Sequence, residues 1–155
     1  MIQRIQSLYL LLTSLLSLLF LNGRFLNFFN KSGSEIYMNI RGIWESSAGG
    51  NPQMIISLIP LSLIILLICI LSFLAIFLFK KRKLQLRLAG TVIFLTIVFI
   101  GMTLYYLFWL TGSYQAELVP GFKMLIPLLI LILGILAYMG IKKDEKLVKS
   151  YDRLR

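Results

Sequence analysis

The sequence has no histidine and a single cysteine, Cys69, among its 155 residues. A zinc or other transition-metal site would have to be built from six scattered carboxylates, which match the nitrogen and sulfur ligands of such metals poorly. One cysteine cannot form a disulfide within the chain. We therefore expect no metal, no cofactor and no disulfide framework.

Charged residues are also scarce. They make up 14% of the chain, against about 25% in soluble domains, while 59% of the residues are hydrophobic. The net charge of +10 would suit nucleic acid if the basic side chains formed one face. They gather instead where apolar runs end. This pattern excludes a water-soluble fold and gives no support for a nucleic-acid partner.

Four apolar runs contain no Asp, Glu, Lys or Arg, and each approaches the roughly 20 residues that cross a bilayer. These runs are 5–21, 54–79, 88–110 and 124–141. We read the first as a retained anchor, because no small-residue cleavage pattern follows it. The sequence thus predicts an all-α integral membrane protein with a single domain, a four-transmembrane-helix bundle.

The basic residues are distributed unevenly between the flanks of these runs. The N-terminal flank, the turn 80–87 and the tail 142–155 hold 12 Lys and Arg, whereas the loops 22–53 and 111–123 hold four. Because cytoplasmic loops are enriched in Lys and Arg, we expect both termini and the turn in the cytoplasm. The two loops should face outward.

The first outward loop shows an apolar alternation at Ile36, Met38 and Ile40, which indicates a short strand. Turn-forming segments flank it, so we expect a β-hairpin or small sheet over the mouth of the bundle. A lone hairpin is marginal in water and would need to pack on the spans or on another protein. The large apolar side chains of this loop are interpreted as interfacial anchors: Phe25, Leu26, Phe28, Phe29 and Trp44.

The four runs contain hydroxyl groups but no group that is ionised at neutral pH. Proton relays and ion-coupled transporters depend on intramembrane charges, so their absence argues against those functions. We expect the hydroxyls, with Gly90, Gly101 and Gly134, to mediate close helix contacts and hydrogen bonds between helices.

The basic turn has two interpretations. It can set the orientation of the spans, or it can also bind anionic lipid head groups at roughly 1 kcal/mol per basic residue. The candidate head-group contacts are Lys80, Lys81, Arg82, Lys83 and Arg87.

The tail has the pattern of an amphipathic helix, with Leu147, Tyr151 and Leu154 at helical spacing and Val148 beside them. It either continues the fourth span into the cytoplasm or lies on the membrane surface. Its apolar stripe is also a candidate docking site for a partner, as is Trp44.

The two ends of the chain, MIQRIQSLYLLL and KKDEKLVKSYDRLR, resemble a family of small four-span inner-membrane proteins of Bacteroidota, catalogued as domain of unknown function 4293. The residues that carry the resemblance are Gln3, Arg4, Gln6, Ser7, Asp144, Glu145, Leu147, Ser150, Asp152, Arg153 and Arg155. The resemblance implies a bacterial inner-membrane location and four spans. It implies no activity and no catalytic residues.

An architectural likeness to claudin-type proteins is also visible. They share four spans, cytoplasmic termini and a larger first outer loop with strand character and a Gly-x-Trp, here Gly42 to Trp44. The loop lacks the claudin cysteine pair, so the likeness is an analogy of architecture alone.

These features favour a non-enzymatic accessory or scaffold subunit of a larger inner-membrane complex, whose partners are other membrane proteins and the bilayer with its anionic lipids. The alternative is a binding or transport protein for a lipid or small hydrophobic molecule, with an anionic head group held by Arg24, Arg41 or Lys123. A membrane enzyme is the third possibility. The outward carboxylates Glu35, Glu45 and Glu117 show no spacing typical of an acid/base pair.

The orientation can be tested with reporter fusions. A reporter that works only in the cytoplasm should be active after Arg155 or within 80–87, and inactive near Gly49, because the basic flanks stay inside. A reporter that works only outside should give the reverse pattern. Equal cytoplasmic signals from all three positions would overturn the four-span topology.

Overall fold

The computed structural model of the chain describes residues 4–29, 35–46, 51–114, 117–119 and 121–153; the side chains of residues 4, 80 and 147–153 fall outside the description. The helices are α1 (Arg4–Leu21), α2 (Ile59–Phe77), α3 (Arg82–Tyr114) and α4 (Ile126–Arg153). Short 3₁₀ turns, Leu78–Lys80 and Phe122–Leu125, follow α2 and precede α4.

Three helical segments are long and apolar enough to cross a membrane, namely Ile59–Phe77, Arg82–Tyr114 and Phe122–Lys146. The fourth, Ile5–Leu21, is a shorter apolar helix. Large hydrophobic side chains are exposed along all four helices, which water would disfavour and lipid would accept. This composition indicates a membrane protein, as the four apolar runs predicted.

The all-α prediction is confirmed in part: helices make up most of the chain, but the chain also forms an antiparallel sheet of five strands in the order β4-β3-β2-β1-β5. The first loop supplies β1 (Arg24–Phe29), β2 (Glu35–Asn39), β3 (Gly42–Ser46) and β4 (Gln53–Ser57). The second loop adds β5 (Glu117–Val119), which pairs with β1. The strand predicted in the first loop is confirmed, but the hairpin is part of a larger sheet that joins both loops.

The predicted helix boundaries also need correction. Residues 54–57 of the second predicted span are strand, and Pro60 lies in the first turn of α2, where its missing N–H costs nothing. The predicted turn 80–87 is shorter, because α3 already begins at Arg82. Residues 142–153 of the tail belong to α4, so they continue the fourth predicted span instead of lying apart from it.

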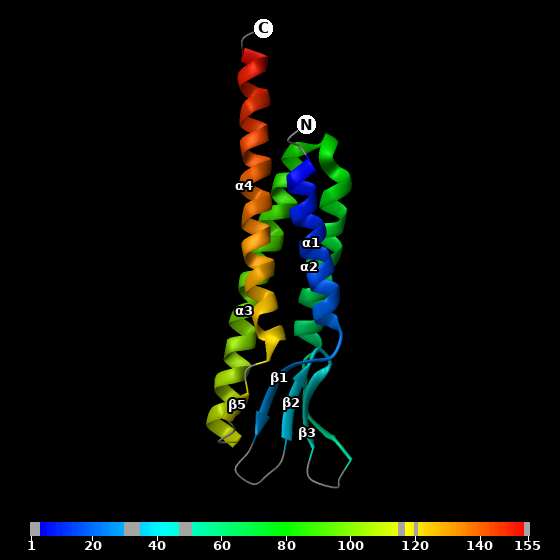
Figure 1. Cartoon of the computed structure of the whole chain (residues 1–155), viewed down its shortest axis with the longest axis vertical. Helices are drawn as coiled ribbons and strands as arrows, with labels where there is room; N and C mark the ends of the chain where they lie inside the picture. Colours follow the sequence, from blue (N-terminus) through cyan, green and yellow to red (C-terminus); the bar gives the residue numbers. More distant parts are fainter. Residues whose placement is uncertain (1–3, 30–34, 47–50, 115–116, 120, 154–155) are drawn as a thin grey trace.

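The two ends of the molecule differ in character (Figure 1). The start of α1 and the α2–α3 turn lie at one end, here called the termini end, and the final turns of α4 project beyond them. The sheet lies at the other end, here called the sheet end, beside the last turns of α3. The described parts of the three segments predicted to be cytoplasmic therefore lie at the termini end, and those of the two predicted outward loops lie at the sheet end.

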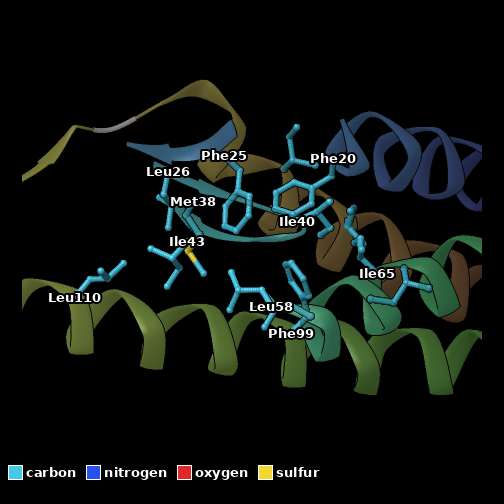
Figure 2. Packing of buried hydrophobic residues seen from close by; sticks show 14 of the residues in the cluster. Phe20, Phe25, Leu26, Met38, Ile40, Ile43, Leu58, Ile65, Phe99 and Leu110 are labelled. Atoms are coloured by element: carbon cyan, nitrogen blue, oxygen red, sulfur yellow. The ribbon is translucent and has the colours of Figure 1, made fainter. Parts of the chain in front are cut away.

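A single hydrophobic cluster runs from the helices into the sheet (Figure 2). The Phe20 ring of α1 lies 4.9 Å from Phe25 of β1 and 5.4 Å, edge to face, from Phe99 of α3. Further along α3, Leu110 packs into the same cluster as Met38 of the sheet. The sheet is thus anchored on the bundle by apolar packing.

This packing corrects the assignment of the loop's aromatic residues. Phe25, Leu26 and Phe28 are fully buried core residues and not interfacial anchors, whereas Phe29 is exposed. A β-bulge between Arg24 and Leu26 breaks the alternation of β1. Because a bulge adds one residue to the strand, both Phe25 and Leu26 face the core.

Two glycines permit the close approaches of this architecture. A Cβ at Gly42 would lie 2.6 Å from the Ile56 carbonyl oxygen, so only glycine lets β3 and β4 pair here. Gly23 has φ of +85° where the chain turns from α1 into β1, a conformation that side chains disfavour.

The hydrogen bonds predicted between helices by the hydroxyls are absent among the described residues. Thr13, Ser17, Thr96 and Thr103 each donate to the carbonyl four residues earlier in their own helix. The predicted close contacts are confirmed in part. Gly90 and Gly134 face side chains across the α3–α4 contact, whereas a Cβ at Gly101 would meet nothing within 4 Å.

The junction of bundle and sheet gives a stability prediction. Phe99→Ala should lower the free energy of unfolding in mild detergent by about 3–5 kcal/mol, because Phe99 is 0% exposed and its removal leaves a cavity. Phe94→Ala on the same helix is the matched control, since Phe94 is 66% exposed and should change stability by less than about 0.5 kcal/mol. Equal losses in the two variants would contradict the observed orientation of α3.

Candidate functional site

Polar side chains from three helices meet at the termini end. The Gln6 amide of α1 donates to a carboxylate oxygen of Asp144 on α4 at 2.7 Å. Arg82 of α3 donates to the Asp144 carbonyl at 3.3 Å, and Gln85 donates to the Ala75 carbonyl of α2 at 3.0 Å. These bonds connect all four helices, and we call Gln6, Arg82, Gln85 and Asp144 the polar clasp.

The helices approach closely at the polar clasp. Gly140 lies one turn before Asp144 on α4, and a Cβ there would come within 2.7 Å of the Gln6 Cγ atom. The clasp borders a cavity of about 20 Å³. A space of this size holds about one water molecule. The arrangement therefore joins helices around a space of about one water molecule.

The polar clasp was not predicted as a site, although Gln6 and Asp144 were among the residues that carry the family resemblance. The signal that could have identified it is the amide of Gln6 within an apolar run. A buried amide requires hydrogen-bond partners, so a polar neighbour from another helix should have been expected there.

The side chains of the basic turn have two different environments. Arg82 points into the polar clasp, whereas Lys81, Lys83 and Arg87 are exposed. The side chain of Lys80 lies outside the described residues. The exposed cations are placed where they can meet head groups, and lipid contact by this turn stays a prediction.

The predicted docking residues of the tail stay untested. Leu147, Val148 and Tyr151 belong to α4, but their side chains fall outside the description, as does all of Leu154. Trp44 is half-buried on β3 at the sheet end. The structure therefore separates Trp44 from the tail residues by the length of the bundle (Figure 1).

Trp44 belongs to a row of side chains across the outer face of the sheet. Directly paired residues of neighbouring strands share a face. The pairs Met54–Trp44, Trp44–Tyr37, Tyr37–Asn27 and Asn27–Val119 therefore align five side chains, one from each strand. We call this row the outer stripe. The opposite face carries the buried residues Ile36, Met38 and Ile43.

Two polar atoms in the outer stripe lack partners. Asn27 Oδ1 and Trp44 Nε1 are covered, and neither has a hydrogen-bond partner among the described residues. Tyr37 lies between them, with the Arg24 guanidinium 3.8 Å from its ring centroid. Arg24 also forms an ion pair with Glu35 at 3.6 Å.

The three outward cations considered for a head group all lie where the bundle meets the sheet. Arg24 follows α1 by three residues, and the Arg41 carbonyl accepts from the amide of Leu58, just before α2. The Lys123 ammonium, just before α4, donates to the Asn22 carbonyl at 2.6 Å. The chain thus places one cation close to each of three helix ends at this junction.

The three outward carboxylates do not form a close pair. Glu117 and Glu35 lie on opposite sides of Phe29 in one row, two strands and therefore about 10 Å apart. Glu45 pairs with Ile36 and so belongs to the other face. Glu35 is also engaged by Arg24. The structure therefore brings no two of these three carboxylates into direct contact.

The polar clasp gives a prediction of coupled energies. Gln6→Leu and Asp144→Ala should each destabilise the protein, and together less than additively, because either change removes the same hydrogen bond. A double-mutant cycle of unfolding free energies in detergent should give a coupling of about 0.5–3 kcal/mol. The control pairs Gln6→Leu with Lys143→Ala, at an exposed position on the same helix, and should be additive. Additivity in both cycles would show that the clasp does not hold α1 to α4.

No curated protein and no solved structure matches the chain. The family described as "Domain of unknown function (DUF4293)" matches residues 2–154, which include both ends of the polar clasp and the entire sheet. The chain therefore belongs to the DUF4293 family.

Proposed function

We propose that this chain is a non-enzymatic accessory or scaffold subunit of a larger bacterial inner-membrane assembly. It crosses the membrane four times with both termini in the cytoplasm, and the sheet lies outside. The outer stripe is the observation that carries the proposal, because it offers a partner an apolar surface beyond the membrane.

The composition of the outer stripe supports a protein contact. Met54 is 53% exposed and Val119 42% exposed, and the aromatic rings of Trp44 and Tyr37 lie between them. Met54, Trp44 and Tyr37 are consecutive in the stripe, and Asn27 separates them from Val119. An apolar group of this kind on a face that meets water is typical of an interaction surface. Trp and Tyr are also the residues that most often dominate binding energy.

The partner surface can be described by its chemistry. It should present apolar side chains to Met54 and Trp44, and polar groups that can pair with Asn27 and Trp44 after a small side-chain movement. An unpaired buried polar group costs about 1–3 kcal/mol, so satisfying these atoms would strengthen the contact. The partner we propose is the outward segment of another membrane protein.

The pairing of β1 with β5 supports the proposed topology. A sheet that contains strands from both loops requires the two loops to lie on the same side of the membrane. This fits two helices between the loops, α2 and α3, that each cross once. The direction follows from the distribution of 12 basic residues in the inner flanks against four in the outer loops.

Co-purification from native membranes tests the proposal. A tagged chain in mild detergent should retain a defined membrane protein in fixed stoichiometry, and Trp44→Ala should reduce its recovery by about tenfold. Phe122→Ala is the control, because Phe122 is 82% exposed at the sheet end but lies outside the outer stripe. A monodisperse lone protein would count against the proposal, as would equal recovery with Trp44→Ala.

A further inference from the structure

We propose that the chain binds one anionic phospholipid at the sheet end, with an acyl chain between α3 and α4 and its head group on Lys123. This site is independent of the outer stripe. It develops the lipid-binding alternative into a single location with a defined ligand class.

An open apolar groove of about 190 Å³ lies between α3 and α4. It exceeds the cavity of roughly 150 Å³ that accepts benzene in an engineered protein, so a segment of one acyl chain fits. Its lining residues are Leu26, Ile100, Thr103, Leu104, Leu107, Met124, Pro127 and Leu128. The hydroxyl of Thr103 donates to the Phe99 carbonyl of its own helix, so the groove presents apolar groups to a ligand.

The groove ends at the sheet. Leu26 of β1 lines it although the other lining residues belong to α3, α4 and the turn before α4. Leu26 is itself held in the core by the bulge of β1. An acyl chain entering beside Met124 would therefore extend from the junction along the helices, into the part of the bundle that is apolar enough for a membrane.

Lys123 is the cation nearest to the groove along the chain. It precedes Met124, a lining residue, and its ammonium uses one hydrogen-bond donor on the Asn22 carbonyl. An ammonium has three donors, which leaves capacity for a phosphate oxygen. A Cβ at Gly23 would come within 2.7 Å of Lys123 Nζ, so glycine at this position leaves space for the ammonium.

The surrounding charges favour an anionic head group over a zwitterionic one. The backbones of Arg24 and Arg41 lie at the same junction of bundle and sheet, where the two residues add positive charge. The Arg24 guanidinium lies over Tyr37 of the outer stripe and pairs with Glu35, so we assign the head-group contact to Lys123 alone.

A second groove provides an internal comparison. It lies between α1 and α2 and has a volume of about 300 Å³. Its lining residues are Ser14, Leu18, Cys69, Ile70, Phe73 and Leu74, none of them charged. Neither groove has a cation among its lining residues, but Lys123 adjoins Met124 of the first groove, whereas no Lys or Arg lies within four residues of any lining residue of the second. The second groove can accept acyl chains, and it should not select between head groups.

Native mass spectrometry of the purified full chain in mild detergent tests the inference. With equal amounts of dioleoyl phosphatidylglycerol and dioleoyl phosphatidylcholine, the wild-type chain should retain one phosphatidylglycerol with a preference of about fivefold. Lys123→Gln should abolish that preference. Leu104→Trp, which fills the groove from a residue that is 44% exposed, should reduce retention of both lipids.

Two controls separate the site from general effects of charge and size. Lys143→Gln removes one positive charge at the termini end, and Leu18→Trp fills the other groove; neither should change the preference. Thermal unfolding identifies any variant that fails to fold, and Leu128→Phe then replaces Leu104→Trp. Lys123→Arg, which keeps the charge, should retain the preference.

Several results would overturn the inference. These are an equal retention of both lipids by the wild type, an unchanged preference in Lys123→Gln, or full retention in both groove-filling variants. Inorganic phosphate provides a further test, because phosphate binding to Lys123 that lipid does not displace would place a soluble anion at the site. None of these results bears on partner recovery through Trp44.

Discussion

The contact of Phe20 with Phe25 and Phe99 fixes the sheet to the helix bundle, and the rest of the structure depends on it. Only residues 22 and 23 separate α1 from β1, so the direction of β1 follows from the position of α1. Once β1 is placed, its two neighbours β2 and β5 place the other strands. The positions of both proposed binding surfaces depend on this junction. The outer stripe lies on the sheet face opposite the packed one. The α3–α4 groove ends at the packed face, where Leu26 lines it.

The two ends of the bundle are held by different physical means. The sheet end relies on apolar packing, which is non-directional and spread over many side chains. The termini end has the smaller apolar cluster around Leu10 and Ala137, and there the polar clasp adds directional bonds between helices. A bundle surrounded by lipid gains little from burying apolar side chains between helices, so packing and hydrogen bonds determine its arrangement. The clasp therefore specifies which helices are neighbours, which apolar side chains alone would specify weakly.

The sequence predicted the helices well because each apolar run is long and free of charge, and composition alone identifies such runs. It predicted the sheet poorly for two local reasons. The bulge in β1 removes the alternation that marks a half-buried strand, and the apolar residues Met54, Ile55 and Ile56 merge with the following helix. The three-residue β5 is too short to carry a pattern of its own. The hydrogen bonds between helices were predicted wrongly because a serine or threonine in a helix can donate its hydrogen bond to its own backbone, which only the structure shows. Of the candidate sites, Trp44 and Lys123 were found from residue type, whereas the outer stripe and the groove required the strand register and the helix packing.

A cross-link between β1 and β5 tests whether both loops form one sheet. Asn27 and Val119 are paired across β1 and β5, and paired residues of antiparallel strands lie about 4.5–5.5 Å apart, within the range of a disulfide. With Cys69→Ser, the pair Asn27→Cys and Val119→Cys should form an intramolecular disulfide in native membranes under oxidising conditions. A protease site engineered into 80–87 would reveal it as one band without reductant and two with reductant. Without reductant, most of the protein should run as the single band. Two bands without reductant, with both cysteines open to thiol labelling, would contradict it.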